Sequence, residues 1–224
     1  MDIFYPLVKF FMHGGVFMIP IALVGAVGAA IVVERYITIT RARAKSRNTW
    51  TQVEPLLAKG DFDKARQLTN KDDTAVSRLL SMGLSLQGAV RRRDDVEKAM
   101  EESMMEIVPQ LEKRTHYLAT FANLATLLGL LGTVSGLIHA FSAVATVNPA
   151  EKANLLSASI SEAMNCTAFG LMTAVPILFA HAFLQTKTTE LIDSLQTASV
   201  KFLNALANRA RTPARVELAR VANG

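Results

Sequence analysis

One acidic residue, Glu162, directly precedes the last of three long uncharged stretches in this sequence. A carboxylate inside a bilayer is costly by several kcal/mol, so acids at such positions usually mark an ion path or a paired site. Burial without a cationic partner favours the protonated form, which lets the group hold or pass a proton. The alternative is that Glu162 lies at the interface and faces water or Lys152.

A stripe of small and hydroxyl residues occupies one helical face of the preceding uncharged stretch. Its members, at helical spacing, are Thr126, Gly129, Thr133, Gly136 and Ala140. Small residues let helices approach closely in lipid, so close packing is an equally good interpretation of the glycines, Gly132 included. The Thr133 hydroxyl can exchange hydrogen bonds with water or with a partner's acid, which makes it an ion-pathway candidate.

The last stretch carries a third ion-pathway candidate, Thr167, together with two residues that shape the helix, Gly170 and Pro176. On a straight helix Glu162 and Thr167 point about 140° apart. They therefore cannot both face one narrow lumen squarely. Either bending near Pro176 redistributes the faces, or Thr167 meets a neighbouring subunit.

These residues need membrane-spanning helices to position them. The stretches Phe10–Val33, Thr115–Ala150 and Ala163–Gln185 contain no Asp, Glu, Lys or Arg. About 20 apolar helical residues cross a hydrocarbon core, and continuous apolar runs favour helices over a barrel. The fold class predicted is an all-α membrane protein with three transmembrane helices, long helices extending into the cytoplasm, and assembly as a ring.

The basic residues predict the topology. Of 24 Lys and Arg, 16 lie between Arg35 and Arg114 and 6 from Lys187 onward. The positive-inside rule places both regions in the cytoplasm and the N-terminus outside. The predicted segments are an outer interfacial segment (1–14), transmembrane helix 1 (15–34), a cytoplasmic helical loop (35–116), transmembrane helix 2 (117–144), a periplasmic loop (145–157), transmembrane helix 3 (158–185) and a cytoplasmic C-terminal helix and tail (186–224).

Local signals predict the helix boundaries of the cytoplasmic loop. Gly60 followed by Asp61 is typical of a helix stop and a new start. Asp94 or Asp95 begins a long helix that we expect to enter the membrane near Tyr117, with Pro109 as a kink or boundary.

Several functional classes find no support in the residues. The glycines of the second stretch follow no strand, which argues against a nucleotide loop, and the four histidines share no metal-ligand spacing. We find no hydrolase triad, and we expect neither an enzyme nor a cofactor or metal. The net charge of +5 follows the membrane topology, so nucleic acid is not an expected partner.

Two motifs resemble the signature spans of the ExbB/TolQ/MotA family of proton channels, most closely ExbB. They are residues 129–136 (GLLGTVSG) and 160–171 (ISEAMNCTAFGL), the latter followed by Ala-Val-Pro at 174–176; residues 111–120 are also similar. By motif position, Thr133 and Thr167 match the family's lumen threonines, Glu162 its third-span acid and Pro176 its third-span proline. Thr126 and Ser135 depart from the family pattern, where proline and, in some ExbB proteins, tryptophan are found.

The resemblance implies a homo-oligomer, a pentameric ring, around a single-span ExbD/TolR-like partner that carries an essential Asp. It also implies an inner-membrane location and a periplasmic energy-transducing protein as a further partner. The function predicted is a pore or stator subunit that couples the proton motive force to work on a periplasmic or outer-membrane client, in the ExbB manner. The alternative is a non-conducting scaffold that clusters partner helices; a solute transporter is disfavoured, because three spans contain no internal repeat.

Overall fold

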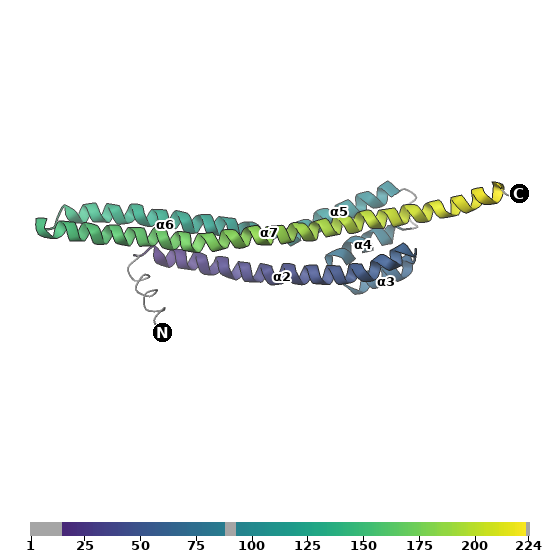
Figure 1. Cartoon of the computed structure of the whole chain (residues 1–224), viewed down its shortest axis with the longest axis horizontal. Helices are drawn as coiled ribbons and strands as arrows, with labels where there is room; N and C mark the ends of the chain where they lie inside the picture. Colours follow the sequence, from purple (N-terminus) through teal and green to yellow (C-terminus); the bar gives the residue numbers. More distant parts are fainter. Residues whose placement is uncertain (1–14, 88–92, 223–224) are drawn as a thin grey trace. The chain divides into compact units, whose positions relative to one another are not determined.

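Every element of the described chain is a helix. The computed structural model describes residues 15–87 and 93–222, with side chains up to Arg209 (Figure 1). In chain order the helices are α2 (Met18–Ala58), α3 (Phe62–Lys71), α4 (Ala75–Leu86), α5 (Arg93–Glu112), α6 (Thr115–Val144) and α7 (Pro149–Ala222). This confirms the all-α prediction; the predicted outer segment, 1–14, lies outside the described residues.

Three stretches of the described chain are long and apolar enough to cross a bilayer. They are Met18–Ala58, Arg93–Val144 and Pro149–Arg209. Each contains most of one uncharged stretch of the sequence, and the helical fold satisfies the backbone hydrogen bonds within each span. The predicted class, a membrane protein with three spanning helices, is confirmed.

The first long helix, α2, continues from the apolar stretch through the basic residues to Ala58 without interruption. It ends where the sequence predicts a stop: Gly60 has φ of +74°, a conformation that costs glycine little. The Asp61 side chain then caps α3 by accepting a hydrogen bond from the Lys64 amide. Both signals depend only on neighbouring residues, which explains why the sequence located them.

The helix expected to run from Asp94 or Asp95 into the membrane near Tyr117 has one short break, and that break does not fall at Pro109. Pro109 lies inside α5, which ends at Glu112, and the break falls at Arg114, whose φ is +68°. This left-handed conformation is uncommon for a residue with a side chain. The Arg114 Nη1 atom lies 3.6 Å from Glu34 Oε1 at the C-terminal end of the first uncharged stretch, so a contact distant in sequence accompanies the break.

The last helix, α7, is longer than the predicted span. It begins at Pro149, so most of residues 145–157 are helical and only a short turn separates α6 from α7. The helix runs uninterrupted past Pro176, whose side chain is exposed.

The chain divides into two compact units. The first contains residues up to Tyr36 together with Arg114–Leu184, and in it α6 and α7 run side by side (Figure 1). Its buried positions on α6 are mostly small, such as Ala122, Ala125 and Gly129, while many of its large apolar side chains, Leu127 and Phe179 among them, are exposed. Such outward apolar faces suit lipid or further membrane helices.

The second unit, Ile37–Lys113 with Gln185–Gly224, has a core like that of a soluble protein. Phe202 lies at its centre and meets Phe62 edge-on, with ring centroids 6.3 Å apart. Charged contacts hold α2 against α7 within this unit: Arg43 Nη1 lies 2.6 Å from Glu190 Oε2. Lys187 and Arg43 together hold the pKa of Glu190 below its ordinary value, so this carboxylate stays ionised at lower pH than an ordinary glutamate does.

Candidate functional site

Glu162 borders a cavity of about 350 Å³ within the first unit. The chain at Gly15 makes room for its carboxyl group: a Cβ atom at Gly15 would overlap Glu162 Oε1, and the φ of +74° at Gly15 is itself disfavoured for other residues. Among the described side chains Glu162 has no ion pair, so the alternative contact with Lys152 is not seen, while the alternative in which the acid faces water fits its exposed side chain. The acid therefore faces a space large enough for water rather than a cation.

The same cavity gathers further polar side chains from both neighbouring helices. Ser135 and His139 come from α6, and Ser159 comes from α7, one turn before Glu162. A carboxyl, an imidazole and two hydroxyl groups therefore border one cavity that is large enough to hold water. No lysine or arginine is among the described residues that line it.

The sequence analysis missed His139, because it tested the histidines only for metal-ligand spacing. A usable signal was present: Ser135 and His139 are four residues apart and therefore lie on one face of a helix. What the sequence did not contain was the contact of that face with the Glu162 side of α7. Within the described residues no group of three or more His, Cys, Asp or Glu could hold a metal ion.

Thr167 points away from this cavity and toward α6. Its Oγ1 atom donates a 2.7 Å hydrogen bond to the carbonyl oxygen of Gly129 in the same chain. Neither of the two expected arrangements, bending at Pro176 or contact with a neighbouring subunit, is needed to accommodate it. With about 140° between them, Glu162 borders the cavity while the Thr167 hydroxyl group bonds the backbone of α6.

The neighbour on the Glu162 side of α7 includes α2. A Cβ atom at Gly25 would lie 2.7 Å from Thr173 Cγ2, and Thr173 projects within about 20° of Glu162 on α7. A Cβ atom at Gly28 of α2 would likewise lie 2.7 Å from Ile177 Cδ1. Thr173 and Ile177 of α7 therefore meet α2, whereas Glu162 borders a cavity that residues of α6 and residues 15–17 line together.

Thr133 is half-buried on α6 and does not line the Glu162 cavity. Its Oγ1 atom donates a 2.6 Å hydrogen bond to the carbonyl oxygen of Leu130, one turn earlier in the helix. A hydroxyl group bound in this way can still accept a hydrogen bond from water or from another helix. The structure thus bonds the Thr133 and Thr167 hydroxyl groups to backbone carbonyl oxygens of α6, and neither threonine lines the Glu162 cavity.

The four glycines proposed for packing lie at the α6–α7 contact. A Cβ atom at Gly170 would lie 2.7 Å from the Ala125 carbonyl oxygen, and one at Gly129 would lie 3.2 Å from the Thr167 Cα atom. Gly132 faces Cys166 in the same way, and Gly136 faces Ala163. The missing side chains allow the two backbones to approach closely, which brings Thr167 within hydrogen-bond distance of Gly129.

Comparison with known proteins gives a consistent result. Residues 71–197 match the MotA/TolQ/ExbB proton channel family. The chain is similar to the biopolymer transport protein ExbB of Neisseria gonorrhoeae, with 28% identity over 207 residues that cover 85% of this chain and 91% of the relative. It is also similar to an ExbB-like biopolymer transport protein of Synechocystis sp., with 26% identity over 77% of this chain and 82% of the relative.

A shorter match joins the chain to the Tol-Pal system protein TolQ of Haemophilus influenzae, 37% identical over 84 residues, which are 38% of this chain and 36% of the relative. The family match includes the two motifs at residues 129–136 and 160–171, with Thr133, Glu162 and Thr167, and it covers more than half of the sequence. The chain belongs to the MotA/TolQ/ExbB proton channel family.

Proposed function

We propose that this chain is the pore or stator subunit of an inner-membrane complex that couples the proton motive force to work on a periplasmic or outer-membrane client, in the manner of ExbB. As a family member with three apolar spanning helices, it is a multi-pass membrane protein with a proton-channel role in energising envelope complexes. The observation that carries the finer proposal is Glu162, an exposed acid without an ion pair among the described side chains, which borders a cavity between spanning helices together with His139 and two serines.

The outward faces of the first unit support the proposed homo-oligomer. On α6, Leu130, Val134 and Phe141 are exposed, as are Met172 and Val175 on α7. Three helices alone leave these faces uncovered, and a ring of copies, a pentamer in our proposal, covers part of them. The remaining faces contact lipid.

The proposed partner is a single-span membrane protein of the ExbD/TolR type with an aspartate in its span. The described uncharged stretches 15–33, 115–150 and 163–185 contain no Asp or Glu, so they offer Glu162, which directly precedes the third, no further carboxyl group to continue a relay. In this proposal the partner supplies that group beside the Thr133 and Thr167 surface, and a periplasmic energy-transducing protein receives the work. The N-terminus is periplasmic and the C-terminus cytoplasmic, and the chain catalyses no covalent reaction.

Proton flux in liposomes tests whether the partner is obligatory. We expect liposomes with the chain alone to conduct protons no faster than empty liposomes, and liposomes with the chain and its single-span partner to conduct under an imposed pH gradient. A normal rate from the chain alone would show that no partner is required. No flux from the assembled complex under any gradient would instead support the non-conducting scaffold.

Two substitutions at Thr133 test the hydroxyl group. Valine keeps the shape of threonine but removes the group that binds the Leu130 carbonyl oxygen, whereas serine keeps it. We expect Thr133→Val to reduce partner-dependent proton flux by about fivefold, which is the effect of losing the net free energy of one hydrogen bond. Thr133→Ser should reduce the flux less. Equal flux from the two variants would remove the hydroxyl group from the proposed path.

A further inference from the structure

A second cavity, of about 340 Å³, lies wholly within the second unit and outside the membrane spans. Its walls are one face of α2 from Ile37 to Ser46, the residues that begin α4, and the end of α5 from Ile107 to Leu111. The proposed proton path uses none of these side chains. Their chemistry is that of an anion-binding site.

The beginning of α4 forms one wall of this cavity, through Thr74 and Ala75. The Thr74 Oγ1 atom caps the helix by accepting a 3.1 Å hydrogen bond from the Ser77 amide. The other amides of the first turn have no acceptor within the helix. Together with the helix dipole, these amides favour an anion at this end of α4.

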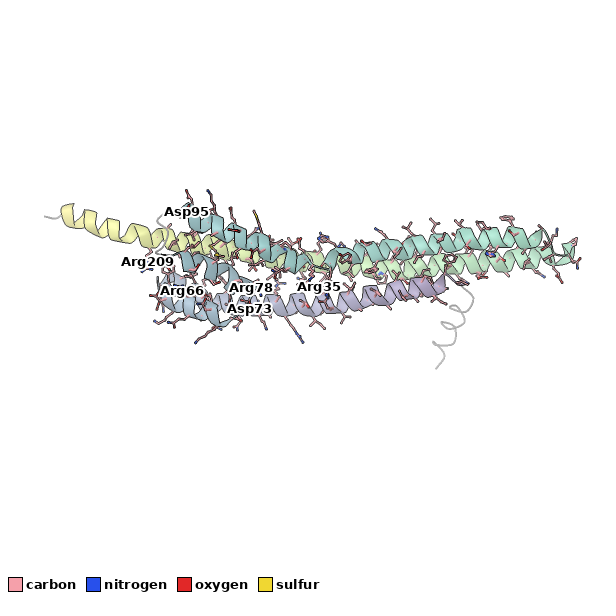
Figure 2. All side chains as sticks on the ribbon, turned by 180° about the vertical axis from the view of Figure 1, so that it is seen from behind. Arg35, Arg66, Asp73, Arg78, Asp95 and Arg209 are labelled. Atoms are coloured by element: carbon pink, nitrogen blue, oxygen red, sulfur yellow. The ribbon has the colours of Figure 1, made fainter. Side chains whose placement is uncertain are left out.

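Cationic side chains surround the same opening. Arg41 and Lys45 lie one turn apart on α2, both are exposed, and neither has an ion pair among the described residues. Arg78 binds Asp73 through 2.7 and 3.0 Å hydrogen bonds, and the two are close together in Figure 2. This pairing holds the pKa of Asp73 below its ordinary value. The paired charges of Asp73 and Arg78 largely cancel, so Arg41 and Lys45 leave the lining positive.

A buried hydroxyl group lines the cavity and has no partner. Ser46 is 2% exposed, and its Oγ atom is not hydrogen-bonded to any described group. A buried donor without an acceptor costs about 1–3 kcal/mol. An oxyanion bound in this cavity would supply the acceptor that Ser46 lacks.

We propose that this cavity binds a phosphate ester, and that its source is the headgroup of an anionic phospholipid. Helix amides, a serine hydroxyl and two free cations together match a phosphate oxyanion. Apolar side chains lie beside them: Ile37, Ile107 and Leu111 also line the cavity. Ile37 follows the first span in sequence and Leu111 precedes the second, so the lining offers an apolar surface for the glycerol and upper acyl carbons.

Two variants of the full-length chain test the site. Arg41→Gln with Lys45→Gln removes the free cations, and Ser46→Ala removes only the hydroxyl group. The matched control is Arg47→Gln with Lys71→Gln, two exposed cations that do not line the cavity. Each protein is purified from bilayers that contain equal molar amounts of phosphatidylglycerol and phosphatidylcholine. The phospholipids that each protein retains are counted by native mass spectrometry. Inorganic phosphate binding to the delipidated protein is measured by calorimetry.

We expect the wild type and the control to retain phosphatidylglycerol in preference to phosphatidylcholine. The double glutamine variant should lose about 25-fold in affinity, roughly fivefold for each cation. Ser46→Ala should also bind more weakly, while its thermal stability without lipid is unchanged or higher, because the substitution removes an unsatisfied donor. Weak phosphate binding beside strong lipid retention identifies the lipid as the source; strong phosphate binding without lipid preference supports the phosphate site with a soluble ester as its ligand.

The proposal is overturned by equal retention of the two lipids together with no phosphate binding. It is also overturned if the control loses as much affinity as the double glutamine variant, since the effect would then be general surface charge. Neither result depends on proton conduction.

Discussion

Glu162→Gln is expected to abolish partner-dependent proton flux, with a loss of about 100-fold or more, while the protein still assembles. Glutamine keeps the size of the side chain beside Gly15 but cannot take up or release a proton. A positioned proton-transfer group typically contributes a factor of about 10²–10⁴. Flux is measured in liposomes containing the chain and its single-span partner, and assembly by light scattering of the purified complex. Glu162→Ala should lose energy-dependent function in cells in the same way.

The matched control is Glu151→Gln, which removes an exposed carboxyl group from the first turn of the same helix. We expect this variant to conduct as the wild type does. Full flux from Glu162→Gln would favour the scaffold over the channel subunit. Loss of assembly in Glu162→Gln alone would assign the residue a structural role.

Gly170→Val is expected to separate α6 from α7 and to reduce the stability of the protein by about 2–3 kcal/mol. The first added carbon would lie 2.7 Å from the Ala125 carbonyl oxygen and 3.1 Å from the Gly129 Cα atom. These are backbone atoms, so no side-chain rotation relieves the overlap. Separation of the helices would also break the hydrogen bond between Thr167 and Gly129. Thermal unfolding in detergent, followed by circular dichroism, measures the loss.

Gly28→Val is the matched control for this prediction. Its added carbon would meet Ile177 Cδ1, the end of a flexible side chain, also at 2.7 Å. The neighbour can rotate away, so the same substitution should cost less than it does at Gly170. If the two variants are equally stable, close backbone approach at Gly170 does not hold the α6–α7 pair together.

The two units of the chain are stabilised differently, and this bears on both predictions. The second unit buries large side chains, Phe202 and Leu80 among them, around its core. The first unit brings helices together through missing side chains at glycine, because lipid provides no hydrophobic drive for spans to associate. Substitutions that add volume are therefore expected to be most damaging in the first unit, and those that remove volume in the second.

The placement of Thr133 and Thr167 away from Glu162 has a consequence for the proposed path. Glu162 faces the cavity it shares with His139, whereas the Thr167 hydroxyl group faces Gly129. A proton passing between these places must move around or along α7. In the proposed complex the partner's aspartate accounts for that step, since the described uncharged stretches 15–33, 115–150 and 163–185 contain no aspartate.

The sequence by itself determined the three spans, the helix stop at Gly60, the start at Asp61 and the identity of the scarce acid, Glu162. Composition and neighbouring residues decide each of these, because an uncharged run must be helical in lipid and a cap acts over a single turn. Only the tertiary structure decided that Thr167 meets Gly129, that His139 shares a cavity with Glu162, and that the break falls at Arg114 instead of Pro109. Each of these features depends on how helices distant in sequence are rotated and aligned against one another. Close contacts at glycine set this arrangement for α6 and α7. No local sequence pattern encodes it.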